Sequence, residues 1–286
     1  MPGDRRLAAI VATSIAMLAF AGNSILCRMA LVDGSIDPAS FTCIRLLAGA
    51  LTLAMVMLAT GRGRKAFANG SWPAAAMLFL YAAGFSYAYV SLGAATGALI
   101  LFGFVQATMI TVGLYRGERP APVEVLGWLV AAAGLTALLL PGASAPGWVA
   151  AGLMASAGVA WGIYSMLGKG QPDPLSVTGA NFLRSIAFVL VLFAFTVSRL
   201  ELSPEGAVLA VVSGALTSGM GYVVWYAALN YLGSLQAALV QLSVPALAAA
   251  GGAMLLREAL TLQVVLSGLA VLGGLCIALL GKAYRR

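Results

Sequence analysis

Ten apolar runs, each near the length of about 20 residues that crosses a bilayer as a helix, follow one another along this chain of 286 residues. Hydrophobic residues make up 62% of the sequence and charged residues 9%, whereas a soluble domain carries about 25% charged residues. So many apolar side chains cannot all be hidden inside a water-soluble globule. The pattern predicts an all-α polytopic membrane protein with ten transmembrane helices. The expected spans are 7–30, 38–60, 72–92, 96–115, 122–140, 147–168, 174–197, 206–229, 234–256 and 261–281.

One short motif occurs twice. Asp37-Pro38-x-Ser40-x-Thr42 returns as Asp173-Pro174-x-Ser176-x-Thr178, 136 residues later. Each copy opens an apolar run, where Asp can cap a helix and Pro suits the first helical position. A second echo comes later in each half, because 93–100 resembles 233–240 and Glu118 resembles Glu258, both at a spacing of 140. These echoes predict an internal duplication, with one five-helix repeat in residues 1–143 and the other in 144–286.

The position of the motif also predicts the relative direction of the two repeats. Five expected spans separate its first copy, which opens the second span, from its second copy, which opens the seventh. Five is an odd number, so the two halves must enter the membrane in opposite directions. Such inverted-topology repeats are the architecture of many secondary transporters, which bind substrate between the repeats near the membrane midplane.

Basic residues predict which side the chain ends occupy. With the N-terminus inside, eleven of the 16 basic residues fall in inner segments. Only Arg28, Arg199 and Arg257 fall outside, and Arg45 and Arg184 lie within spans. The positive-inside rule therefore favours cytoplasmic N- and C-termini in a plasma membrane of the bacterial inner-membrane type. It also accounts for the net charge of +7, so no nucleic-acid partner is expected.

The order of these motifs resembles that of the EamA-type drug/metabolite transporter superfamily. Two five-helix repeats, Asp-Pro-x-Ser-x-Thr at the second helix, an Arg within that helix and a Glu just after the fourth helix carry the resemblance over the whole chain. One departure is that the second half has Pro245 in its fourth helix, whereas the matching position near Val105 and Gln106 has no Pro. The two halves are therefore expected to bend differently.

Within that superfamily the chain is most similar to aromatic amino-acid exporters. The resemblance implies export of small, partly apolar metabolites, aromatic or neutral amino acids first, by alternating access and without a cofactor. The expected partners are a small-molecule substrate and the lipid bilayer, and a monomer is the simplest assembly. The sequence has three cysteines, Cys27, Cys43 and Cys276. Because they are odd in number and scattered along the chain, they favour neither a disulfide framework nor a metal site.

Arg45 and Arg184 are the ionisable residues expected within spans, where a charge is costly and therefore a functional candidate. Each arginine has two interpretations: it attracts a substrate carboxylate, or it clamps carbonyl groups at a helix end. Glu118 and Glu258 are expected to hold the turns between the fourth and fifth helices of each repeat.

Buried amides and mid-span aromatic residues are the other candidates. Amides in lipid must find partners within the bundle, as substrate ligands or as contacts between helices. Trp161, inside Gly158-x-x-x-Gly162, is expected either to wall an apolar pocket or to fill the core. Gly219, Gly221 and Pro245 are expected to act as hinges. The expected substrate-binding residues are Asn23, Tyr81, Phe85, Phe102, Gln106, Trp161, Tyr164, Tyr222, Tyr226 and Gln241.

Three other classes of function were weighed against amino-acid export. Export of lipophilic cations by the same kind of transporter lacks a carboxylate within a span to pair with the cation. A membrane enzyme is not favoured, because the sequence has no His and no pair of acids within a span. Ser-His hydrolysis, metal chemistry and two-carboxylate catalysis depend on such residues. A structural scaffold would not need a duplication with buried amides.

Transport should not require a proton or sodium gradient. Proton relays in membranes use Asp, Glu or His within the spans, but all nine acids here fall at span ends or in loops. A facilitator driven by the gradient of its own substrate is therefore expected. The measurement is uptake into vesicles with every ion gradient collapsed. Loss of transport while the substrate gradient persists would contradict this prediction.

Overall fold

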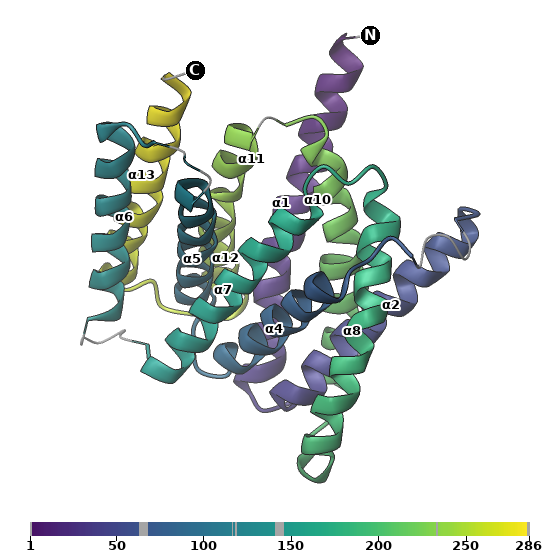
Figure 1. Ribbon diagram of the computed structural model, residues 1–286. Helices are drawn as coiled ribbons and strands as arrows, with labels where there is room; N and C mark the ends of the chain where they lie inside the picture. The colour runs from purple at the N-terminus through teal and green to yellow at the C-terminus, as the bar shows by residue number, and fades with distance from the viewer. Residues whose placement is uncertain are drawn as a thin grey trace.

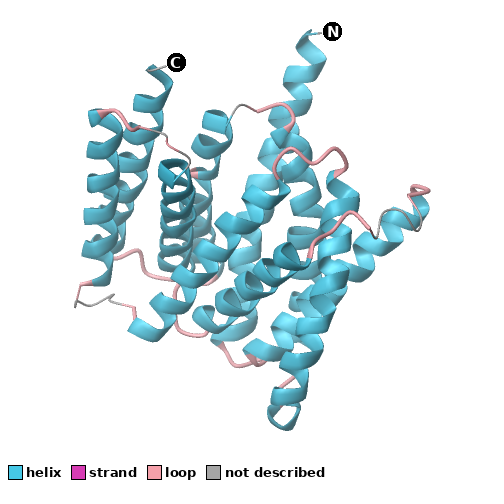
Figure 2. Cartoon of the chain, in the orientation of Figure 1, coloured by secondary structure: helices cyan, strands magenta, loops and turns pink. Residues whose placement is uncertain are grey.

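Helices make up nearly all of the chain. The computed structural model describes residues 2–62, 68–115, 117, 119–140, 146–232 and 234–284, so Glu118 lies outside the described residues. Within these ranges the structure is helical (Figure 2), apart from turns and an isolated β-bridge between Ile36 and Leu202. In chain order the helices are α1 (Pro2–Val32), α2 (Pro38–Ala59), α4 (Trp72–Tyr89), α5 (Ala94–Tyr115), α6 (Pro122–Leu139), α7 (Trp148–Gly168), α8 (Pro174–Thr196), η1 (Val197–Arg199), α9 (Pro204–Val212), η2 (Ser213–Met220), α10 (Gly221–Leu229), α11 (Ser234–Gln241), α12 (Ser243–Leu255) and α13 (Leu262–Tyr284).

Helix fills every apolar run that the sequence marks out. In the described part of the chain, 8 helical segments are long and apolar enough to cross a membrane, with α9, η2 and α10 forming one of them. Two further runs are helical but less suited. α4, whose 18 residues include three tyrosines, is not among these 8 segments, and Leu242 interrupts the run that holds α11 and α12. The prediction of an all-helical protein with many apolar helices is confirmed.

The repeated Asp-Pro motif starts a helix in both halves. The Asp37 carboxylate accepts hydrogen bonds from the backbone N–H groups of Ala39 and Ser40, both at 2.9 Å. The Asp173 carboxylate accepts one from the backbone N–H of Ser176 at 3.3 Å. Because the first N–H groups of a helix have no partner within it, these carboxylates stabilise the first turns of α2 and α8. The predicted capping role of both motifs is confirmed.

Helices from the two halves of the sequence pack against one another (Figure 1). α2 lies against α8, and α6 lies against α13 at one edge of the bundle. Likewise α4 and α5 pack on α7, while α10 and α12 pack on α1. Both chain ends lie on the same side of the bundle. Most of the buried core is therefore formed between the halves, and it joins into one cluster of apolar side chains.

α2 crosses η2, which is a π-helical segment, at very short range. A Cβ atom added to Gly214 would lie 2.1 Å from the carbonyl oxygen of Arg45. One added to Gly49 would lie 3.0 Å from the carbonyl oxygen of Gly214. Small residues allow such close backbone approach between membrane helices. Two glycines therefore bring the segment that carries Arg45 against the segment that carries Ser213, Thr217 and Ser218.

The expected hinge residues lie where helices of the second half are irregular. Gly219 is part of η2 and Gly221 begins α10. Because Pro245 has no N–H to offer the carbonyl group of Gln241, a break at this point is expected, and α11 does end at Gln241. In the first half α5 has no such Pro and runs unbroken from Ala94 to Tyr115. The two halves thus differ in helix continuity.

Substitution of Gly214 by Ala should destabilise the protein, because the new Cβ atom would overlap the backbone of α2. Overpacking costs about 1–3 kcal/mol, which lowers the melting temperature by several degrees, at about 2–4 °C per kcal/mol. Gly152→Ala is the matched control, since a Cβ atom at Gly152 of α7 meets nothing within 4 Å. The measurement is thermal unfolding in detergent. Equal melting temperatures for the two variants would refute the close crossing.

Candidate functional site

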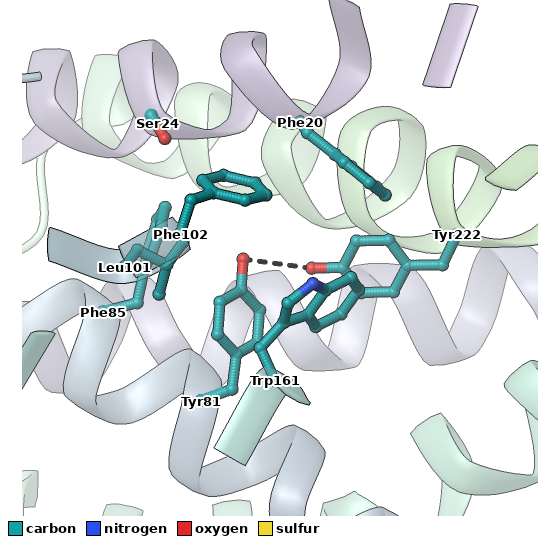
Figure 3. A pocket seen from close by; sticks show the side chains of 8 residues that line it. All are labelled: Phe20, Ser24, Tyr81, Phe85, Leu101, Phe102, Trp161 and Tyr222. Carbon is teal, nitrogen blue, oxygen red and sulfur yellow. Dashed lines mark hydrogen bonds between the residues drawn. The ribbon is translucent and has the colours of Figure 1, made fainter. Parts of the chain in front are cut away.

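A small aromatic cavity lies where five helices meet (Figure 3). It has a volume of about 10 Å³, which is room for about one water molecule. Six of its eight lining side chains are aromatic, and the hydroxyl groups of Tyr81 and Tyr222 meet at its edge. The lining residues are Phe20 and Ser24 of α1, Tyr81 and Phe85 of α4, Leu101 and Phe102 of α5, Trp161 of α7 and Tyr222 of α10.

Trp161 lies at the centre of the aromatic wall and contacts several of its rings. Its ring centroid lies 4.6 Å from that of Tyr222 and 4.9 Å from that of Tyr81. Phe20 meets it edge-on, with centroids 5.6 Å apart. Aromatic pairs at these distances are mutually stabilising beyond the area that they bury. Trp161 is 3% exposed, so it both packs the core and faces the cavity.

Arg45 lies beside this cavity as a fully buried charge, since only 1% of its surface is exposed. Its Nε donates a hydrogen bond to Ser218 Oγ at 2.9 Å. Its Nη2 donates to the hydroxyl oxygens of Tyr222 and Tyr81 at 3.1 and 3.2 Å. The guanidinium carbon also lies 5.0 Å from the ring centre of Phe85, within the range of a cation–π contact.

Within the described residues Arg45 contacts uncharged groups. The salt bridges among these residues are Arg28–Glu258 and Arg62–Asp173, and neither involves Arg45. Its Nη1 is buried and has no hydrogen-bond partner in the described part of the chain. A buried charge without an opposite charge is costly and needs every available hydrogen bond. The guanidinium group of Arg45 therefore keeps one donor without an acceptor in this part of the chain.

Asn23 of α1 organises the polar side of the site. Its amide oxygen accepts hydrogen bonds from the hydroxyl groups of Ser213 and Ser218 at 2.8 and 3.3 Å. Thr217 Oγ1 lies 3.2 Å from the same oxygen, but its proton has a closer acceptor in the Ser213 carbonyl oxygen at 2.8 Å. These hydroxyl groups orient the amide so that its nitrogen donates to the Tyr81 hydroxyl at 3.1 Å. Ser218 thus links Asn23 to Arg45, and the expected amide at this site is placed beside the cavity.

The other expected site residues lie outside the cavity lining. Tyr164 packs on Trp161 with ring centroids 5.6 Å apart, and Tyr226 packs behind Tyr164. Gln106 Nε2 and Gln241 Oε1 are buried without a hydrogen-bond partner among the described residues. The structure therefore brings together Asn23, Tyr81, Phe85, Phe102, Trp161 and Tyr222, and it sets Gln106, Tyr164, Tyr226 and Gln241 apart.

The two span arginines have different surroundings. Arg45 follows its capping Asp by 8 residues and Arg184 follows its own by 11, so their positions in the repeats differ. Arg184 donates to the carbonyl oxygen of Ala180 in its own helix at 3.2 Å, whereas Arg45 reaches tyrosine and serine hydroxyls on other helices. Both interpretations of each arginine stay predictions.

Several residues of the site were not among the expected ones: Phe20, Ser24 and Leu101 in the lining, and Ser213, Thr217 and Ser218 around Asn23. Phe20 and Ser24 lie within about one turn of Asn23 on α1. The expected role of Asn23 was therefore a signal for these two neighbours as well. The three hydroxyl residues carried no signal beyond composition. Three side chains of the kinds that bind metals do not come together anywhere in the part of the chain that the structure describes.

Comparison with known proteins identifies a domain in the second half of the chain. Residues 148–280 match the model of the EamA-like transporter family. The chain carries an EamA-like transporter domain. Over 285 residues it is also 53% identical to Uncharacterized protein PA1977 of Pseudomonas aeruginosa, covering 99% of this chain and 98% of that protein. The two proteins therefore belong to one family. A crystal structure described only as that of a protein shares the fold, with a TM-score of 0.68 at 20% identity over 94% of this chain and 98% of the other.

The EamA-like domain supplies only part of the site. Trp161, Tyr222 and the hydroxyl residues of η2 fall within the matched residues, while Arg45, Asn23 and Tyr81 precede them. The cavity is thus shared between the domain and the first half of the chain.

An ion pair at one end of the bundle ties the EamA-like domain to the first half. Glu258 Oε1 lies 2.9 Å from Arg28 Nε, and both side chains are less than one-fifth exposed at 19% and 14%. Glu258 Oε2 accepts a hydrogen bond from the backbone N–H of Ala94, which begins α5. A role for Glu258 in holding the adjacent turn stays a prediction. Its carboxylate joins the turn after α12 to α1 and α5.

A second ion pair crosses between the halves at the opposite end of the bundle (Figure 1), where Arg62 Nε lies 3.1 Å from Asp173 Oδ2. Partial burial by itself raises the pKa of Asp173, but hydrogen bonds from Ser176 and Arg62 outweigh it and lower the pKa below its ordinary value. Asp37 makes the matching link on the other side, since its carboxylate accepts from the backbone N–H of Glu201 at 3.1 Å. Each capping Asp therefore contacts the opposite half.

Substitution of Glu258 by Ala should destabilise the protein, because Arg28 and the N–H of Ala94 lose their acceptor. An unsatisfied partly buried group costs about 1–3 kcal/mol. Glu205→Ala is the control, since Glu205 is exposed at the start of α9. Thermal unfolding in detergent should show a lower melting temperature for Glu258→Ala alone. In the Glu258→Ala background, Arg28→Ala should lower the melting temperature by less than it does in the unchanged protein. Additive losses would show that the two residues act independently.

Proposed function

We propose that this chain is an inner-membrane exporter of ten spans, built from two inverted five-helix repeats in residues 1–143 and 144–286. Support comes from the reciprocal packing of the helices. The second helices of the halves, α2 and α8, pair with each other, and so do the fifth helices, α6 and α13. The first helix of each half packs on the third and fourth helices of the other. This exchange is what a two-fold axis between the halves would produce.

The proposed substrates are small, partly apolar metabolites that carry a carboxylate, with aromatic and neutral amino acids foremost. The observation that carries this proposal is Arg45, which is buried beside an aromatic cavity without an acidic partner among the described residues. A guanidinium group matches a carboxylate in charge and geometry. The aromatic walls suit an apolar side chain, as in most small-molecule sites.

Alternating access supplies the proposed mechanism. At about 10 Å³ the cavity is too small for an amino acid, so helices must move apart to admit one. The ion pairs Arg28–Glu258 and Arg62–Asp173 join the halves at opposite ends of the bundle, and opening either end requires its pair to separate. Gly219, Gly221 and Pro245 are the proposed points of bending. The proposed carrier is a facilitator that works as a monomer, with both termini in the cytoplasm.

The alternative within the same superfamily is export of lipophilic cations. Aromatic walls suit a cation, but Arg45 already lies against the rings of Tyr81 and Phe85, and its charge repels another cation. The test is counterflow in proteoliposomes of purified protein, with labelled phenylalanine, alanine and a lipophilic cation as alternative substrates. Movement of phenylalanine supports the proposal. Movement of the cation alone supports the alternative, and movement of none of them refutes both.

Trp161→Ala should impair transport of phenylalanine more than transport of alanine, because only the larger side chain reaches the aromatic wall. Loss of an aromatic contact costs about 0.5–1.5 kcal/mol beyond buried area, so a severalfold difference between the substrates is expected. Trp148→Ala is the matched control, since Trp148 lies on the same helix and is 72% exposed. Equal loss for both substrates at unchanged protein level would make Trp161 a packing residue only.

A further inference from the structure

We propose that the cavity binds aromatic carboxylates that lack an ammonium group in preference to aromatic amino acids. This inference rests on the proposed export of carboxylates, and within that class it places aromatic carboxylates without an ammonium group ahead of the amino acids. It is carried by two properties of the described site: an excess of hydrogen-bond donors, and a positive charge with no negative one beside it.

Donors outnumber acceptors where the two tyrosine hydroxyls meet. The Tyr81 oxygen is approached by Asn23 Nδ2 at 3.1 Å, Arg45 Nη2 at 3.2 Å and the Tyr222 hydroxyl at 3.3 Å. A hydroxyl oxygen has two lone pairs for these three donors. Only one of the two tyrosine protons can lie between the two oxygens, so the other is left for a further acceptor.

Two more donors belong to this part of the site. Arg45 Nη1 is buried without a partner in the described residues, on the guanidinium group whose Nη2 donates to both tyrosines. The indole nitrogen of Trp161, which only donates, lies on the side of its ring that faces the tyrosine pair (Figure 3). A ligand that completes this arrangement must accept several hydrogen bonds, and a carboxylate oxygen does so.

A carboxylate that could pair with an ammonium group is missing from the cavity lining. The eight lining residues include no acidic side chain and no amide, and outside the tyrosine pair their hydroxyl group is that of Ser24. The nearby amide oxygen of Asn23 already accepts from Ser213 and Ser218. An amino acid would bring its ammonium group next to the charge of Arg45, where the lining offers no opposite charge.

Charge leads to the same conclusion. Arg45 places one positive charge at the site, and the salt bridges of the described residues lie at the ends of the bundle. A monoanionic carboxylate neutralises Arg45 and adds no second charge, whereas a zwitterion adds a positive charge together with the negative one. Six aromatic lining residues then surround the remaining apolar part of the ligand, and they favour an aromatic ring.

Three ligands with one carbon skeleton test the inference: 3-phenylpropanoate, phenylalanine and phenethylamine. They carry the carboxylate alone, both charged groups, and the ammonium alone. Binding to purified protein in detergent is measured by calorimetry, so permeation of the free acid through a bilayer does not interfere. We expect 3-phenylpropanoate to bind at least about tenfold more tightly than phenylalanine, because the ammonium group is unpaired, and phenethylamine to show no binding.

The ratio of the two affinities in variants shows whether Arg45 causes the preference. Arg45→Gln should reduce the ratio towards one, and Arg184→Gln, which changes the other arginine within a span, should leave it unchanged. If Arg45→Gln does not fold, Tyr222→Phe removes one hydroxyl donor and should lower the ratio severalfold. An unchanged ratio in a folded Arg45→Gln or Tyr222→Phe protein overturns the assignment.

The outcomes separate this inference from the proposed function. Phenylalanine that is transported and binds as tightly as 3-phenylpropanoate overturns the inference and leaves the exporter standing. If neither ligand binds and neither is transported, the proposed function fails and the inference fails with it.

Discussion

The buried guanidinium group of Arg45 is the constraint on which the centre of this protein depends. A charge that is 1% exposed in an apolar bundle is tolerated only where hydrogen bonds surround it. Ser218, Tyr81 and Tyr222 supply them from three different segments. Asn23 then fixes Tyr81 and Ser218 in turn. The polar centre is therefore one connected network, and α1, α2, α4, η2 and α10 must meet for it to form.

Glycine makes that meeting possible. At Gly49 and Gly214 the backbones of α2 and η2 are in close contact. This contact brings Arg45 of α2 within hydrogen-bonding distance of Ser218, which follows Gly214 by one turn of η2. Polar contacts elsewhere gather at the two ends of the bundle, where Asp37, Asp173 and Glu258 each bind the opposite half. Between the centre and the ends the helices meet through apolar side chains. The halves are thus held together in three layers, and the middle layer borders the aromatic cavity.

Sequence reasoning reached the helices, their caps and most of the aromatic wall, because these follow from local patterns. An Asp-Pro pair before an apolar run caps a helix wherever the chain goes afterwards. The surroundings of Arg45 and Arg184 could not be predicted, since each is an arginine a few turns into an apolar run and the partners of Arg45 lie far away in the sequence. The roles of Ser213 and Thr217 and the link from Glu258 to Arg28 were also hidden, because each depends on a contact between residues far apart in the chain.

An unneutralised arginine in the middle of a membrane carrier has an electrical consequence. A charge that crosses the whole membrane potential changes in energy by about 2.3 kcal/mol per 100 mV. For the proposed anionic substrates, the loaded site is neutral and the empty site carries the charge of Arg45. Voltage then acts on the return of the empty carrier, while the loaded step is insensitive to it. Each cycle thereby moves the negative charge of the substrate across the membrane, so the membrane potential contributes to the driving force without a coupled proton or sodium ion.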